Sequence, residues 1–154
     1  MKPLIVLLAV FCLSIFVLKI ITHKYNVFLS AQIAMCAMLF FTAMGHFAFT
    51  KGMVLMVPSF IPFKTEIVYL TGVLEILFGI GILIPSLRIY CAWSLIIFFI
   101  LLLPANIYAA IKHINYQEGT FDGNELSYLW FRVPLQILFI AWIYLSTINQ
   151  INII

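Results

Sequence analysis

Five long runs of apolar residues, separated by shorter polar segments, set the pattern of the chain. They cover residues 3–22, 27–49, 66–84, 89–111 and 128–147. A helix needs about 20 mostly apolar residues to cross the hydrocarbon core of a bilayer. The first run is longer than the apolar part of a signal peptide, and no A-x-A-like cleavage site follows it, so we expect a retained helix. The pattern predicts an all-α, polytopic membrane protein with five transmembrane helices.

The composition supports this fold class and argues against others. Of the 154 residues, 66% are hydrophobic and 8% are charged, and the mean hydropathy is +1.20. A soluble domain is about half apolar and one quarter charged. The eight Lys and Arg residues lie mostly at predicted helix ends and form no basic stripe, so no nucleic-acid partner is expected. The three cysteines lie inside apolar runs without CxxC spacing, which is typical of small buried residues.

An odd number of spans puts the two chain ends on opposite sides of the membrane. The side on which the chain begins, here called the N-terminal side, then carries the two long connections, residues 50–65 and 112–127. Four basic residues on this side against three on the other give no orientation. Long connections in a compact bundle are often functional. The second one holds most of the acidic residues and is interpreted either as a solvated cap or as a lid.

Several polar side chains interrupt the apolar runs at similar depths. Counting about 1.5 Å per helical residue puts them roughly 5 to 13 Å inside the N-terminal side. They come from four different predicted helices: His46, Glu75, Asn106, Arg132 and Gln136. Ionisable groups within a membrane are costly and usually face the bundle interior. The shared depth predicts a polar pocket inside a four-helix bundle, open toward the N-terminal side.

The spacing along two helices supports the same pocket. Thr71 and Glu75 are four residues apart and share a helix face, as do Tyr128, Arg132 and Gln136. A buried charge needs compensation, so either Glu75 and Arg132 form an ion pair or Glu75 is neutral. The alternative interpretation is purely structural: the pair holds two helices together while His46 caps its helix at headgroup level.

The segment GHFAFTKGMVLMVPSFIP, residues 45–62, begins at the end of the second run and continues past it with two prolines. We expect the chain to leave regular structure here and to cover the mouth of the pocket. Its aromatic and methionine side chains suit a flat apolar ligand, although they equally suit a loop lying on the membrane. Pro58 and Phe60 are therefore candidate ligand contacts.

The motifs GHF, MVPSFIP, TGVLEILFGIGILIP and LLPANIYAA, in this order, resemble those of the DoxX-like membrane protein family over about residues 31–147. The resemblance implies a four-helix membrane domain, residues 27–154, to which residues 1–26 add one N-terminal helix. Some DoxX-like relatives are small subunits of thiosulfate–quinone oxidoreductases or partners in membrane redox complexes. More distantly, the bundle is similar to sterol isomerases and sterol-binding receptors.

Three functions remain open on the sequence. The preferred one is a lipophilic-ligand site, quinone-like or isoprenoid-like, in a redox-linked membrane process. The alternatives are a stand-alone lipid-modifying enzyme of the isomerase type and a non-catalytic assembly factor or subunit. If the protein is an enzyme, we expect proton-transfer or redox chemistry, with Glu75, His46 and Arg132 as the catalytic groups. The expected ligand contacts are Asn106, Gln136, Thr71, Tyr128, Pro58 and Phe60.

No motif for a haem, flavin or nucleotide is present, so any cofactor is unknown, with a quinone as the candidate. A metal site built from His46, Glu75 and His113 lacks ligand spacing, and none is predicted. We expect a multi-pass protein of the bacterial inner (plasma) membrane. The expected partners are the lipid bilayer and either a membrane-protein partner or a second copy of the chain.

Overall fold

The computed structural model describes residues 2–123 and 129–149. Its long helices are α1 (Lys2–Thr22), α2 (Val27–Ala48), α4 (Lys64–Leu83), α5 (Arg88–Ile111) and α6 (Leu129–Ile143), the last continued by a π-helical segment, η2 (Tyr144–Ile148). Within these described residues, five spans are long and apolar enough to cross a membrane, with α6 and η2 forming the fifth. The predicted all-α, polytopic fold is confirmed, with boundaries within two residues of the predicted runs.

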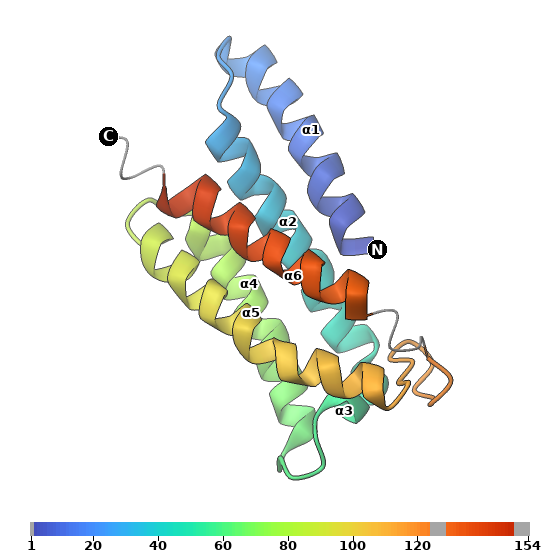
Figure 1. The fold of residues 1–154 in the computed structure, drawn as a ribbon. Coiled ribbons are helices and arrows are strands. Elements are labelled where there is room, and N and C mark those ends of the chain that lie inside the picture. The colour runs from blue at the N-terminus through green and yellow to red at the C-terminus, as the bar shows by residue number, and fades with distance from the viewer. Residues whose placement is uncertain (1, 124–128, 150–154) are drawn as a thin grey trace.

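Helices α2, α4, α5 and α6 form a bundle, and α1 lies outside it along α2 (Figure 1). The core between them consists of side chains that are almost completely buried: Leu7, Met35, Met38, Leu39, Ile82, Leu95 and Ile143. Leu7 is the buried residue of α1, whose other side chains stay at least partly exposed. Phe11 of α1 meets Trp142 of α6 edge-on, with 5.0 Å between ring centroids. The exposed apolar faces are those expected of helices surrounded by lipid.

Glycines bring α2 and α4 into close contact. A Cβ atom added at Gly72 of α4 would lie 2.9 Å from the Cβ atom of His46 on α2. A Cβ atom added at Gly79 of α4 would lie 3.5 Å from the Sγ atom of Cys36 on α2. Small residues allow helix backbones to approach in a membrane, where packing rather than the hydrophobic effect drives association. This approach sets His46 beside the turn of α4 that carries Glu75.

The prediction that the chain leaves regular structure after residue 49 was wrong for its first seven residues. Thr50–Met56 form a short helix, α3. The hydroxyl of Thr50 donates to the carbonyl of His46 at 2.7 Å, which joins α3 to the end of α2. Helix α3 ends at Met56, because the next residue, Val57, takes an extended conformation with ψ of 123°. Pro58 explains this end, because a residue before proline is disfavoured in the helical region.

Residues 112–123 lie beside α3 at the same end of the bundle (Figure 1). They make a tight turn with a backbone bridge between Asn115 and Thr120. A Cβ atom at Gly52 of α3 would overlap the backbone carbonyl of Tyr116, so the two segments are in direct backbone contact. Helix α3 together with residues 112–123 is called the cap below.

Candidate functional site

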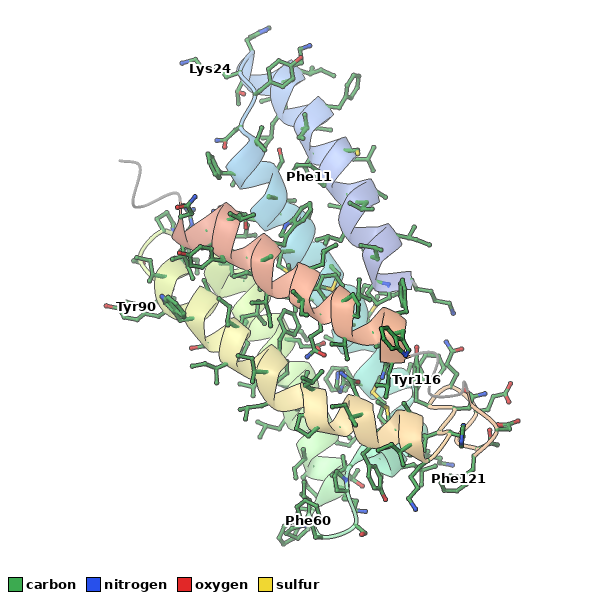
Figure 2. The ribbon with its side chains drawn as sticks, in the orientation of Figure 1. Phe11, Lys24, Phe60, Tyr90, Tyr116 and Phe121 are labelled. Carbon is green, nitrogen blue, oxygen red and sulfur yellow. The ribbon has the colours of Figure 1, made fainter. Side chains whose placement is uncertain are left out.

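A cavity of about 710 Å³ lies beneath the cap, bounded by α2 and α4 on one wall and by α5 and α6 on the other. Every predicted site residue that the structure describes contributes to its lining: His46, Pro58, Phe60, Thr71, Glu75, Asn106, Arg132 and Gln136. Phe60 lies at the rim, is 83% exposed and points away from the bundle (Figure 2). Tyr128, the remaining predicted contact, lies outside the described residues.

The deeper lining of the cavity is apolar. Phe98 and Phe99 of α5, Phe139 of α6 and Met38 of α2 are all buried and line it. Phe99 and Phe139 lie 5.9 Å apart between ring centroids. Ligand cavities of roughly 300–1,000 Å³ that are mostly apolar, with a few placed polar groups, are typical of small-molecule sites. The shape and lining therefore suit an apolar molecule.

The first polar group in the cavity is centred on His46. Its Nδ1 atom lies 3.1 Å from the carbonyl oxygen of Val68 and 3.1 Å from the hydroxyl of Thr71. The Thr71 hydroxyl lies 2.9 Å from the same Val68 carbonyl and donates its own proton to it. Two groups of α4 thus hold the imidazole ring of His46, which belongs to α2, in one orientation.

Glu75 lies on the other side of the imidazole. Its side chain is only 5% exposed, and its Oε1 atom is 3.5 Å from the Nε2 atom of His46. The second carboxyl oxygen, Oε2, is buried and has no hydrogen-bond partner among the residues that the structure describes. Buried polar atoms are nearly always paired, so an unpaired one in a cavity wall needs a physical explanation.

The facing wall carries a second polar group. Arg132 of α6 donates from Nη1 to the Oδ1 atom of Asn106 on α5 at 2.7 Å. Asn106 donates from Nδ2 to the Oε1 atom of Gln136 at 3.4 Å, and Gln136 donates to the backbone carbonyl of Phe99. The guanidinium also lies 5.9 Å from the ring centroid of Tyr116, within cation–π range. The hydrogen bonds thus tie α6 to α5, and the cation–π contact joins α6 to the cap.

The expected Glu75–Arg132 ion pair is not the arrangement that the structure has. Among residues 2–123 and 129–149, the titratable side chain beside Glu75 is His46, and no ion pair joins Glu75 to Arg132. The physical reason is the close α2–α4 contact at Gly72, which brings His46 to Glu75 first. Arg132 is engaged on its own wall by Asn106.

Sequence reasoning missed two contributors to the site. Tyr116 comes from the acidic connection, and its ring centroid lies 5.9 Å from the guanidinium carbon of Arg132. The signal available in the sequence was an aromatic residue within a polar segment. The carbonyl of Val68 orients His46, and no sequence pattern marks a backbone acceptor. Gln32 of α2 does not line the cavity, and its Nε2 atom donates to the carbonyl of Ser146 at 2.9 Å.

The described residues contain no group of three His, Cys, Asp or Glu side chains that could hold a metal ion. His113, in the cap, is exposed and does not line the cavity. The polar lining of the cavity comprises the two hydrogen-bonded groups on facing walls together with Lys2, Thr42 and Gln117.

Comparison with known proteins assigns the family. The model of a family described as Domain of unknown function (DUF8561) matches residues 35–147, so the chain belongs to this family. The match contains the residues of both polar groups and leaves out α1. No curated protein and no solved structure matches the chain.

Proposed function

We propose that this DUF8561 protein binds a lipophilic ligand, quinone-like or isoprenoid-like, in a redox-linked membrane process. The observation that carries the proposal is Glu75, a buried carboxyl group with one unpaired oxygen, in the wall of a cavity of about 710 Å³. A folded protein rarely leaves such an atom without a partner. A ligand that fills the cavity can supply the missing hydrogen bond.

The distribution of polar groups favours a ligand with an apolar body and a few oxygen atoms. His46 and Glu75 lie on the wall made by α2 and α4, and Arg132 and Asn106 on the wall made by α5 and α6. Between and below them the lining is aromatic and aliphatic. A flat molecule with polar atoms near its edges can contact both walls while its apolar part lies over the aromatic floor.

The openings of the cavity favour a ligand that comes from the bilayer. Met44 of α2 and Leu101 of α5 both line the cavity, and they are 60% and 70% exposed. Both lie within membrane-spanning helices. The cavity thus reaches lipid-facing surfaces of the bundle, where a lipophilic molecule is concentrated.

The pair formed by His46 and Glu75 suits proton exchange with a ligand oxygen. A carboxyl and an imidazole in a dry cavity can hold one proton between them and pass it to or accept it from a bound molecule. Arg132 on the facing wall would stabilise negative charge that develops on the ligand. The same pair also supports the second candidate, an isomerase-type enzyme that moves a proton on a lipid.

The redox-linked setting and the location in a bacterial inner membrane rest on the resemblance to DoxX-like proteins. In that setting the ligand would be a quinone or its reduced form, and a membrane-protein partner would supply the electrons. The third candidate, an assembly factor, would need a partner but no ligand.

Mass spectrometry of the protein purified in mild detergent tests the proposal. We expect the wild type to carry a defined small lipophilic molecule that is lost in Glu75→Leu. The matched control is Glu66→Leu, the same change on α4 at an exposed residue outside the cavity lining, which should keep the molecule. A stoichiometric protein partner without any small molecule would overturn the ligand proposal in favour of the assembly factor.

A further inference from the structure

We propose that the cavity selects molecules that carry a hydroxyl group, such as a quinol, a phenol or an isoprenoid alcohol, over matched molecules whose oxygens only accept hydrogen bonds. This inference rests on the proposed function and names the chemical class of its ligand. It follows from the positions of two protons in the His46–Glu75 pair, argued in turn below.

The first proton belongs to Nδ1 of His46. The carbonyl of Val68, 3.1 Å away, can only accept a hydrogen bond. The hydroxyl of Thr71, also 3.1 Å away, uses its proton on that carbonyl and therefore turns a lone pair toward the ring. Both neighbours of Nδ1 are acceptors, so the geometry assigns the ring proton to Nδ1.

The second proton lies between Nε2 of His46 and Oε1 of Glu75, which are 3.5 Å apart. If neither atom carried a proton, two lone pairs would face each other in a buried site. The pair is therefore either an imidazolium with a carboxylate or a neutral imidazole with a carboxylic acid that donates to Nε2. In both forms the pair holds the same total number of protons and is neutral overall.

Both forms leave Oε2 of Glu75 with lone pairs only. This atom is buried and unpaired in the part of the chain that the structure describes, and Glu75 lines the cavity. The terminal torsion of a glutamate side chain is broad, so the carboxyl group can turn an oxygen toward a ligand. A ligand oxygen that bears a proton satisfies the carboxyl group, whereas a ketone or ether oxygen would meet it lone pair to lone pair.

The selectivity should be measurable. A site whose buried polar atom pairs with a ligand hydroxyl discriminates strongly against the analogue that lacks it, because the atom is then left unpaired. Because a buried acceptor left without its hydrogen bond costs about 1–3 kcal/mol, we expect a preference of roughly tenfold or more.

The experiment uses the full chain in lipid nanodiscs and two probes that differ by one methyl group, 4-nonylphenol and its methyl ether, 4-nonylanisole. Equilibrium dialysis against empty nanodiscs of the same lipid corrects for partition into the bilayer. We expect the phenol to bind wild-type protein about tenfold or more tightly than the ether.

Three variants assign the preference to the His46–Glu75 pair. In Glu75→Leu the carboxyl acceptor is gone and Nε2 of His46 is the acceptor that remains, so the ratio of the two dissociation constants should fall several-fold. In the double variant His46→Leu/Glu75→Leu both acceptors are gone, so the ratio should fall to about one. In Glu75→Gln the side-chain NH₂ can donate to Nε2 of His46 while the amide oxygen replaces Oε2, so a smaller preference for the phenol should remain.

The possible outcomes separate the two proposals. If neither probe binds wild-type protein above its partition into empty nanodiscs, the proposed function fails. If both probes bind equally, the ligand site stands and the selection for a hydroxyl group is overturned. A preference for the phenol that survives undiminished in folded His46→Leu/Glu75→Leu protein would also overturn it, because another acceptor would then be responsible.

Discussion

The contact between His46 and Glu75 lowers the free-energy cost of burying each of these polar side chains within the membrane. A lone carboxyl at this depth would lie in a site of low dielectric, where the charged form is strongly disfavoured. The imidazole, 14% exposed, supplies a partner for one carboxyl oxygen, and the carbonyl of Val68 holds the imidazole in place. The two residues therefore act as one unit, both in stability and in any exchange of protons with a ligand.

A double-mutant cycle should show that His46 and Glu75 are coupled in their contribution to the free energy of unfolding. His46→Leu leaves Glu75 buried without a partner and should lower the free energy of unfolding by about 3 kcal/mol. The double variant with Glu75→Leu should lose less than the sum of the single losses, by at least about 1 kcal/mol. Thermal or SDS-induced unfolding in mild detergent measures each value. If the coupling appears between Glu75 and Arg132 instead, the partner assignment is wrong.

For single residues, the sequence predicted the depth of each polar side chain along its helix but not which side chains are in contact. Counting residues along each helix was enough to expect His46, Glu75 and Arg132 in the same half of the membrane, and the structure brings all three to one cavity. Which of them touch depends on how the helices are rotated and how closely they pack. Glu75 meets His46 because Gly72 allows α2 and α4 to approach, and that contact is a property of two elements together.

Helices α2 and α4 together form the cavity wall that carries His46 and Glu75. Gly72 and Gly79 both face α2, but they differ in the space around them. A Cβ atom at Gly72 would lie 2.9 Å from the Cβ atom of His46, which cannot move without its helix. A Cβ atom at Gly79 would make an ordinary contact of 3.5 Å with the sulfur of Cys36. The two positions thus offer a matched test on one helix.

Gly72→Ala should be less stable than Gly79→Ala by about 1–3 kcal/mol, the usual cost of overpacking. Both changes gain the helix propensity of alanine, up to about 1 kcal/mol, so this gain cancels in the comparison. Gly72→Ala should also weaken binding of 4-nonylphenol, because separating α2 from α4 pulls His46 from Glu75. Unfolding in detergent and equilibrium dialysis check the two effects. Equal stabilities of the two variants would show that α2 and α4 separate without cost at Gly72.

Helix α3 shows why short elements escape prediction. Thr50–Met56 form only seven residues, too few for a period of 3.6 to stand out, and the two prolines that follow them favoured an irregular segment. The helix owes its place to contacts with other parts of the chain, among them the backbone contact between Gly52 and Tyr116. Long apolar spans, in contrast, are set by bilayer thickness and were predictable within two residues.

The cavity lies at one end of the helix bundle, whereas the helices are joined by a tight turn at the other end. At the N-terminal side the two walls of the bundle separate, and the cap covers the space between them. At the opposite side the chain turns tightly between α4 and α5, and the side chain of Arg88 donates to the carbonyl of Ile82 at 3.0 Å. Exchange of a ligand between the cavity and its surroundings therefore involves the cap or the lipid-facing flanks.

The contact between Gly52 and Tyr116 should decide how firmly the cap is closed. In Gly52→Ala the new methyl group would overlap the backbone of residue 116, so α3 and residues 112–123 must separate. We expect trypsin to cleave after Lys112 several-fold faster than in the wild type, because cleavage follows local opening. The control is Gly45→Ala, whose Cβ atom would lie 3.4 Å from the flexible end of Met53 and should leave the rate unchanged.

The same two variants separate the routes by which a ligand exchanges. If it leaves through the cap, release of 4-nonylphenol from preloaded nanodiscs should be faster in Gly52→Ala than in Gly45→Ala. If it leaves sideways, past Met44 or Leu101, the two variants should release it equally fast although trypsin distinguishes them. We expect the second result, because both of these exposed side chains border the cavity within the membrane and an apolar ligand gains nothing by passing through the cap into water. Faster release from Gly52→Ala would contradict this route and assign the cap as the gate.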